Sequence, residues 1–320
     1  MSTGTDFEEP LRKLRTRLAE LEGYPDSPAK RRESQKLSEK LTRLSREIYQ
    51  NLSPWQKTLV ARHPSRPFCL DYVRLLVGDF VEWHGDRGFA DDAAVVAGFG
   101  LFAGRPVAVV GHQKGRDTKE KIRRNFGMPR PEGYRKALRV MKLAEKFRRP
   151  VLTFIDTPGA YPGLDSEERG VSEAIARNLI EMAALRTPIV ATVTGEGGSG
   201  GALGIGVADS VLMLEHSVYS VISPEGCAAI LWKDQSKARE AAEAMRITAA
   251  DCKALSVVDE VVPEPPGGAH ADPVATIETV GRAVLAQLER LSALPVEELL
   301  ERRYAKFRRL GVFEGTAPER

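Results

Sequence analysis

The stretch TPIVATVTGEGGSGGALGIGVADSVLML, Thr187–Leu214, decides the fold of this chain. It opens with a short apolar run, Thr187–Val193, whose β-branched residues are typical of a buried strand. A glycine-rich segment follows, in which five of the seven residues Gly195–Gly201 are glycine. Because glycine weakens strand and helix interiors by roughly 0.5–1 kcal/mol each, so many in a row need a reason. The pattern predicts a strand, a sharp turn, a helix from about Ser199 and a further strand.

The same alternation of strand and helix continues on both sides of this stretch. Runs typical of buried strands occur at Ala93–Phe102, Arg105–Gly111 and Arg149–Asp156, and Asp209–Ile222 provides one or two more. Longer amphipathic segments typical of helices lie between them, at Glu132–Phe147 and Ser166–Leu185. Strands that alternate with helices of this length predict an α/β core with parallel pairing.

Both ends of the chain are predicted to be helical. Apolar residues recur at helical spacing on either side of a break at Gly23–Pro28, namely Leu11, Leu14, Leu18, Leu21, Leu37, Leu41, Leu44 and Ile48. This pattern predicts a helical hairpin, which serves as a packing arm or as a partner-binding arm. The tail beyond Pro273 is also helical in pattern. We therefore divide the chain into an arm (1–55), a core (56–265) and a C-terminal extension (266–320).

Composition limits the class of protein. The chain has 320 residues, 42% of them hydrophobic and 28% charged, which is typical of a globular protein. A net charge of +3 gives no reason to expect nucleic acid as a partner. The three cysteines form no C-x-x-C pair, so no disulfide framework or zinc ribbon is expected and a reducing compartment fits. We find no signal-peptide pattern and no membrane-spanning run, and expect a soluble cytoplasmic protein.

Two strand ends carry unusual loops, one in Phe154–Gly163 and one in Gly195–Gly201, and each precedes a predicted helix. Ligands of α/β sheets bind beyond the carboxyl ends of the strands. The N-terminus of a helix presents unpaired N–H groups and partial positive charge, and glycine leaves room for a ligand to reach them. Two such loops side by side could stabilise negative charge that develops on a carbonyl oxygen, as an oxyanion hole does.

Other interpretations of these loops compete with an oxyanion hole. The FIDTPG sequence resembles a nucleotide-hydrolase strand, but the chain has no P-loop. The spacing of Gly195, Gly197 and Gly200 fits a dinucleotide fingerprint, although other strands precede it. The segment Gly197–Gly201 fits a nucleophile elbow with Ser199 as nucleophile, for which downstream acids and bases exist at Asp209, His216 and His270. Tight packing of helix on strand explains one or two of the glycines.

Histidines and basic residues add weaker signals. None of the five histidines is paired at helical spacing, so we expect none to act as a general base; His112, after a strand, is the most site-like. No metal-ligand spacing occurs, and no metal is expected in this chain. Lys114 and Arg116 follow the same strand and could bind a carboxylate or another anion, with a basic rim formed by Lys119, Lys121, Arg123 and Arg124.

Five longer segments, in this order, carry a family resemblance: Gly111–Arg139, Phe154–Gly163, Glu167–Leu179, Gly195–Asp209 and Tyr219–Asp234. Together they closely resemble the α-subunit family of the carboxyltransferase of bacterial acetyl-CoA carboxylase. The resemblance covers about Phe7 to Leu310 and includes the segments Ala61–Val73 and Val261–His270. The N-terminal helical arm matches in character more than in sequence.

The resemblance implies a crotonase-like (ClpP/crotonase) fold, a spiral of ββα units, here with an N-terminal helical hairpin and C-terminal helices. It implies transfer of a carboxyl group from carboxybiotin, carried on a biotin carboxyl carrier protein, to acetyl-CoA, giving malonyl-CoA for fatty acid biosynthesis. It also implies an α₂β₂ assembly with a β subunit that holds zinc and most of the CoA surface, and a biotin carboxylase as a further partner. Biotin itself is not expected to be attached to this chain.

The resemblance also suggests roles for individual residues. Backbone donors are expected at Ala160, Gly163, Gly198, Gly200 and Gly201. Substrate-binding roles are expected for Lys114, Arg116, Gly159, Ser199 and Ser223, the last also as a helix cap. The biotin enolate can take the methyl proton, so no protein base is needed.

Two other classes of function compete with this one. The first is another acyl-CoA enzyme of the same fold, such as a propionyl-CoA carboxyltransferase, a decarboxylase or a hydratase. The second is a non-enzymatic module whose basic segments bind nucleic acid.

Overall fold

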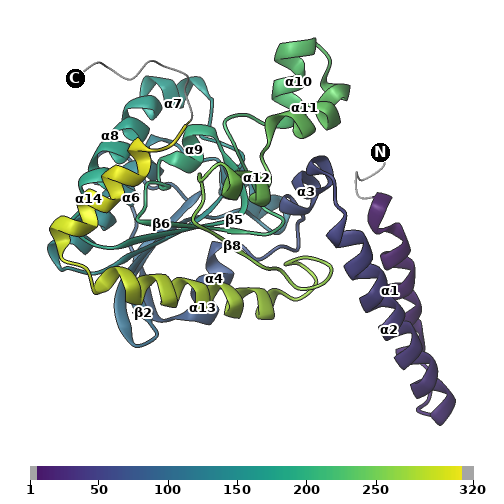
Figure 1. Cartoon of the computed structure of the whole chain (residues 1–320). Helices are drawn as coiled ribbons and strands as arrows, with labels where there is room; N and C mark the ends of the chain where they lie inside the picture. Colours follow the sequence, from purple (N-terminus) through teal and green to yellow (C-terminus); the bar gives the residue numbers. More distant parts are fainter. Residues whose placement is uncertain (1–5, 312–320) are drawn as a thin grey trace, which may run out of the picture.

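The computed structural model describes residues 6–311 and consists of a mixed sheet with helices on both faces (Figure 1). The sheet has eight strands in the order β1-β2-β3-β4-β5-β6-β8, and β7 pairs with β5 off this path. The strands are β1 (Val77–Glu82), β2 (Val95–Phe102), β3 (Arg105–His112), β4 (Val151–Thr157), β5 (Ile189–Gly198), β6 (Ser210–Leu214), β7 (Val218–Ser220) and β8 (Glu260–Val262).

The direction of pairing changes across the sheet. Strands β1, β2 and β3 pair antiparallel, whereas β3, β4, β5, β6 and β8 are parallel. Strand β5 pairs twice on one side, with β6 along Val190–Val193 and with β7 along Glu196–Gly198. The second half of β5 thus changes partner from β6 to β7 while it stays paired with β4 at Thr157, and the change occurs within the glycine-rich segment.

Helices cover the two faces because successive strand residues point to opposite sides. Val95 of β2 packs on the face covered by α6 (Pro131–Lys146) and α8 (Val171–Ala184). The adjacent Val96 packs on the opposite face, which is covered by α4 (Cys69–Leu76) and α13 (Pro273–Ser292). Both cores are apolar and closed, which explains why the central strands are continuous apolar runs.

The N-terminal hairpin consists of α1 (Glu9–Glu22) and α2 (Pro28–Gln50), which extend away from the sheet (Figure 1). Of the predicted apolar residues, Leu11 packs in one cluster with Tyr49, Leu52 and Val60, and Leu41, Leu44 and Ile48 pack against this cluster. The chain then enters the body through α3 (Pro54–Ala61), whose cap is Ser53. At the other end, α14 (Val296–Arg308) lies against α8.

Short helices complete the fold. They are α5 (Thr118–Arg123), α7 (Leu164–Glu168), α9 (Ser199–Leu203), α10 (Pro224–Trp232), α11 (Ala238–Met245) and α12 (Ala249–Ala254), with single 3₁₀ turns at η1 (Asp6–Glu8), η2 (Asn125–Gly127) and η3 (Gln235–Lys237). Within residues 6–311, no helix combines the length and the apolar character needed to cross a membrane.

The predicted strands and long helices are confirmed, with two differences. First, β5 continues through Gly195–Gly198 as strand, so the turn itself is confined to Ser199, which has a φ of 53°. Second, the predicted helix at Ser166–Leu185 is broken into α7 and α8, because Gly170 at the junction has a φ of 78°. The short edge strands β1 and β8, which carry no clear alternation, were not predicted.

Arg303 of α14 provides a test of how the C-terminal helix is held. Its side chain is 1% exposed, pairs with Asp209 at 2.7 Å and donates to the carbonyls of Met182, Leu185 and Thr187. The Arg303→Ala change leaves a buried carboxylate and these carbonyls without their donor. We expect the free energy of unfolding, measured by urea titration, to fall by about 3–5 kcal/mol.

The neighbouring Arg302 is the matched control. Its ion pair with Glu298 is exposed, so Arg302→Ala should change the free energy of unfolding by less than about 1 kcal/mol. Equal effects of the two substitutions would contradict this account of the C-terminal helix.

Candidate active site

The exits of β4 and β5 lie against each other at the carboxyl edge of the sheet, as predicted. Thr157 of β4 is opposite Gly197 of β5. A Cβ atom on Gly201 would lie 2.4 Å from the Gly159 carbonyl carbon and 2.5 Å from the Ala160 nitrogen. These distances are shorter than any side chain tolerates, so the two loops are joined backbone to backbone.

Close packing accounts for more of the glycines than the sequence indicated. A Cβ atom would lie 2.2 Å from the Pro158 oxygen at Gly198, 2.3 Å from the Asp156 carboxylate at Gly195 and 2.5 Å from the Tyr219 ring at Gly197. Gly200 differs, because a Cβ atom there would meet only the Ile175 side chain, at an ordinary distance of 3.6 Å. Packing therefore requires glycine at four of the five positions and leaves Gly200 to another explanation.

Three backbone amides next to one another lack acceptors. Gly200 and Gly201 lie in the first turn of α9, where N–H groups have no intrahelical partner. The Ala160 N–H, in the facing loop, also has no hydrogen-bond acceptor among residues 6–311. Ser199 is exposed, Gly159, Ala160 and Gly200 are half-buried, and Gly201 is buried, so solvent reaches the edge of this place at Ser199 and Ala160. The arrangement fits the two-sided set of donors expected of an oxyanion hole.

The remaining loop residues have defined local positions. Gly159 has a φ of 150°, the space where its Cβ atom would lie is open, and its N–H donates to Thr157 Oγ1 at 3.1 Å. Gly163 precedes α7 as its N-cap residue. Ser223 caps α10, because its Oγ accepts the Gly226 N–H at 3.1 Å, and this predicted cap is confirmed. The local geometry of Gly159, Gly163 and Ser223 does not test whether these residues bind a ligand.

Lys114 lies behind the two loops, where its ammonium contacts two carboxylates of the same chain. Its Nζ is 2.8 Å from Asp156 Oδ1 and 2.9 Å from Glu196 Oε2. Although burial opposes the charged form, these carboxylates raise the pKa of Lys114 above its usual value. Burial would raise the pKa of Glu196, but Lys114 and Arg62 outweigh it and lower this pKa to about 2. Lys114 and Glu196 are therefore both ionised near neutral pH.

Arg116 is more exposed than Lys114, and its side chain is held by residues 64–71. Its guanidinium pairs with Asp71, donates to the carbonyls of Pro64 and Arg66, and stacks 4.2 Å from the centroid of Phe68. The predicted basic rim needs one correction. Arg124 is only 7% exposed and donates to the Ala93 carbonyl, so it holds a loop and does not face solvent.

His112 is close to the site but is built into the core. It is fully buried, and its Nδ1 faces the Asp156 N–H at 3.4 Å. Burial, with a further contribution from the Lys114 ammonium, lowers the pKa of His112 to about 3, against a smaller opposing effect of the Gly201 carbonyl. His112 is therefore neutral and serves as a hydrogen-bond acceptor near neutral pH.

The nucleophile-elbow interpretation fails on geometry. Asp209 is bound to Arg303. His216 and His270 both lie against Tyr49 of the arm. The parts of a Ser–Asp–His triad are thus not assembled around Ser199.

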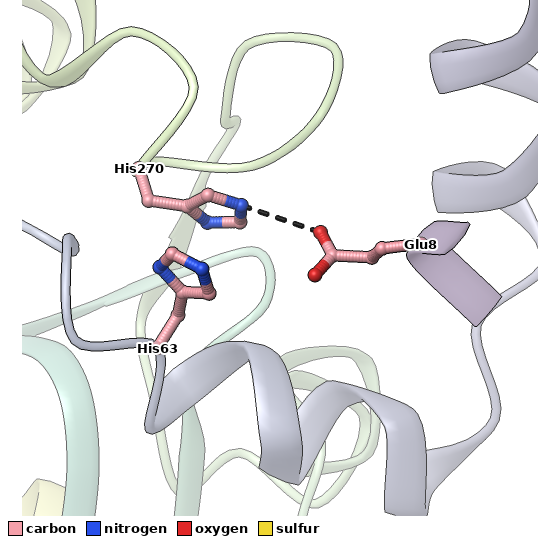
Figure 2. A group of neighbouring side chains, drawn as sticks. All are labelled: Glu8, His63 and His270. Atoms are coloured by element: carbon pink, nitrogen blue, oxygen red, sulfur yellow. Dashed lines mark ion pairs between the residues drawn. The ribbon is translucent and has the colours of Figure 1, made fainter. Parts of the chain in front are cut away.

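Glu8, His63 and His270 come from distant parts of the chain and face one another, as Figure 2 shows. One ligand atom from each lies within 4.8 Å of the others, which makes them a possible metal group that sequence spacing did not reveal. However, the two rings stack at an interplanar angle of 23° with centroids 3.7 Å apart, so their lone pairs do not converge on one point. His63 Nδ1 also accepts the Ser65 N–H at 3.2 Å.

We interpret this group as the anchor of the arm. The Tyr49 hydroxyl donates to Glu8 and lies 3.3 Å from His270 Nε2, which is itself 3.4 Å from Glu8. Burial works against the charged carboxylate, but hydrogen bonds from His270 and Tyr49 lower the pKa of Glu8 overall. The anchor thus joins the first helical turn, the end of α2 and the loop before α13.

The sequence analysis missed the charged residues that support the loops: Arg62, Asp156, Glu196 and Glu225. Arg62 Nε is 2.6 Å from Glu196, and the same guanidinium pairs with Glu225 of α10. A signal was available for two of them. Asp156 and Glu196 lie within apolar or glycine-rich strand sequence, and a carboxylate buried in a strand needs a cationic partner.

Solved structures with the same fold define a class of protein. The chain is similar to transcarboxylase 12S (TM-score 0.57, 20% identity, 72% of this chain and 42% of that chain). It is also similar to a Pseudomonas malonate decarboxylase hetero-tetramer in complex with coenzyme A (TM-score 0.56, 17% identity, 68% of this chain and 90% of that chain). These identities support the fold alone, which is the expected crotonase-like fold of carboxyltransferases and decarboxylases.

Sequence relatives identify the family within that class. The family described as acetyl co-enzyme A carboxylase carboxyltransferase-like matches residues 4–311, and the chain belongs to it. Relatives named acetyl-coenzyme A carboxylase carboxyl transferase subunit alpha are similar over nearly their full length. That of Halalkalibacterium halodurans is 56% identical over 98% of this chain and 97% of its own. That of Xanthomonas oryzae pv. oryzae is 55% identical over 97% and 98%.

His112 makes stability depend on pH. Its folded-state pKa of about 3 lies below the unfolded value of about 6.5, so the unfolded chain binds the proton more tightly between these values. This contribution is present above pH 6.5 and is lost as pH falls. We expect it to remove about 3 kcal/mol from the free energy of unfolding by pH 4.

The His112→Asn variant isolates this effect, since its Oδ1 can accept the Asp156 N–H without titrating. Urea unfolding of both proteins between pH 7 and pH 4 should give a flatter pH profile for the variant. Parallel profiles would contradict the assignment of His112 as a buried neutral group.

Proposed function

We propose that this chain is the α subunit of an acetyl-CoA carboxylase carboxyltransferase. It would take part in moving the carboxyl group from N1-carboxybiotin, on a separate carrier protein, to the methyl carbon of acetyl-CoA. The product would be malonyl-CoA, a precursor of fatty acids. Membership of the family, together with identities above 50% to relatives of that name over nearly the full chain, supports this proposal.

One geometric observation carries the chemical part of the proposal: the Gly201 backbone lies against Gly159 and Ala160, and among residues 6–311 the amides of Ala160, Gly200 and Gly201 have no backbone acceptor. Loss of carbon dioxide from carboxybiotin places negative charge on the ureido oxygen. Loss of the methyl proton from acetyl-CoA places it on the thioester oxygen. Fixed donors stabilise such charges, and one donor is typically worth about 2.7–4 kcal/mol. We assign Gly200, Gly201 and Ala160 to one of these oxygens, with Gly198 and Gly163 shaping the loops.

Partners follow from the same proposal. A β subunit would complete the site and hold the zinc, and the assembly would be α₂β₂. A biotin carboxyl carrier protein and a biotin carboxylase would supply the carboxylated biotin. The word "subunit" in the names of the relatives supports a partner chain without identifying it.

Coexpression with the cognate β subunit tests the function. The purified complex should exchange carboxyl groups between malonyl-CoA and biocytin, and a series of acyl-CoAs should show a preference for acetyl-CoA. Turnover by the α chain alone on an acyl-CoA would favour a self-sufficient enzyme of the same fold.

Gly200 tests the donor assignment without disturbing packing. Because Ile175 alone is near its Cβ position, at 3.6 Å, Gly200→Val should fold and assemble. The added methyl groups should block access to the amides and reduce the exchange rate at least about 100-fold.

Gly201→Val is the contrasting variant. Its side chain would clash with Gly159 and Ala160, so stability should fall together with activity. Wild-type turnover by Gly200→Val would contradict the donor assignment.

Lys114 and Arg116 remain proposed contacts of the transferred carboxylate. Gly159, Ser199 and Ser223 remain proposed substrate-binding residues, with Ser223 assigned to the biotin side of the site. The internal carboxylate partners of Lys114 and Arg116 make a second role possible, which is support of the loops. Direct contact predicts that Lys114→Met and Arg116→Met raise the KM for malonyl-CoA or biocytin about tenfold, the size of one charge-assisted hydrogen bond. Loop support alone predicts a lower kcat with unchanged KM. Unchanged kcat and KM in both variants would contradict either role.

A further inference from the structure

Arg62 connects the strand that carries the glycine turn to a helix outside the sheet. It follows α3 directly, and its side chain is 27% exposed. One side of the guanidinium contacts Glu196 Oε1 at 2.6 Å, and the other side contacts both carboxylate oxygens of Glu225, one of them at 3.2 Å. A planar guanidinium with several donors is suited to such a bridge, which a lysine cannot reproduce.

The contact with Glu196 reaches the backbone of the site. Glu196 is 8% exposed and lies two positions before Gly198 on β5. Its N–H donates to Asp156 Oδ1 at 2.9 Å, and its second carboxylate oxygen contacts Lys114. Lys114 and Arg62 thus hold the Glu196 carboxylate from two sides.

The contact with Glu225 reaches a pair of helices outside the sheet, which packs on the body through α11 and α3. Helices α10 and α11 pack on each other and lie outside the body, beyond α3 in Figure 1. Within residues 6–311, the Arg62–Glu225 pair is the only ion pair that joins α10 to another element. The outer side of α10 is apolar, with Ile230 and Leu231 about two-thirds exposed. Glu225 lies in the first turn of α10, two residues after Ser223.

We infer that Arg62 is a positioning residue, which holds the start of α10 at a fixed place beside the glycine turn by bridging Glu196 and Glu225. This inference rests on the proposed function for its effect on catalysis, because Ser223 is there assigned to the biotin side of the site. Arg62 itself touches none of the proposed reacting groups. Its removal therefore acts on the placement of α10.

Hydrogen exchange followed by mass spectrometry tests the placement independently of activity. In the αβ complex, Arg62→Met should raise exchange of the peptides covering residues 221–247 about tenfold, the effect of losing one charge-assisted contact. The fold should survive, because Glu196 keeps Lys114 as its partner. Glu225→Gln removes no buried cation and should give the same increase. Exchange in the double variant should be little faster than in either single variant, because both changes break the same Arg62–Glu225 contact.

Kinetics separate positioning from general support. Both single variants should raise the KM for biocytin about tenfold, with the KM for malonyl-CoA unchanged, whereas a merely structural role lowers the amount of active enzyme. Compared with Arg62→Met, the Arg62→Lys variant should be as stable as the wild type but should recover only part of the biocytin affinity. Arg302→Ala, which removes an exposed ion pair on α14, is the control for loss of an arginine.

The outcomes are distinguishable. Unchanged exchange in residues 221–247 in both single variants overturns the inference, as does an effect of Arg62→Met that Glu225→Gln does not share. If the wild-type complex has no carboxyl-transfer activity, the proposed function fails, and hydrogen exchange still decides the role of Arg62.

Discussion

The contact between the exits of β4 and β5 is the constraint on which the rest of the site depends. Gly201 lies on the backbone of Gly159 and Ala160 with no space for a methyl group. The ladder between β4 and β5 holds the two strands at this separation, and buried charged groups behind the loops add to it. The buried groups Lys114, Asp156 and Glu196 do so, since each carboxylate is on a different strand and the ammonium bridges them. The backbone amides of the two loops and the buried charges of Lys114, Asp156 and Glu196 therefore form one structural unit.

The buried charged groups behind the loops also contact further elements of the fold. A buried ion pair gains stability only when its geometry is close to ideal and its other lone pairs are satisfied. Here Asp156 also accepts the Glu196 N–H, and Glu196 also contacts Arg62. The strands, α3 and α10 thus meet in one network, and the parts furthest from the glycine turn are held through it.

The sequence predicted those parts of the fold that depend on local pattern. The hairpin β2–β3, the central strands, the long helices and the arm all follow from apolar periodicity or from turn residues. The course of β5 did not follow, because its glycine-rich half is held as strand by pairing with β7 and by close packing on Tyr219 and Asp156. The loops of the site were found by their glycines. Arg62 and Glu225 were not found, because the contact that gives them a role joins positions distant in sequence.

The anchor in Figure 2 has a consequence for the order in which the molecule is made. Glu8 and Tyr49 are synthesised before His270, which follows Tyr49 by 221 residues. The hairpin α1–α2 can form early, because its leucines pair within it. The anchor can fix the hairpin to the body only after the loop before α13, which carries His270, has been synthesised. A chain that has not yet been synthesised as far as His270 therefore lacks one residue of this anchor, and its hairpin is not fixed to the body through it.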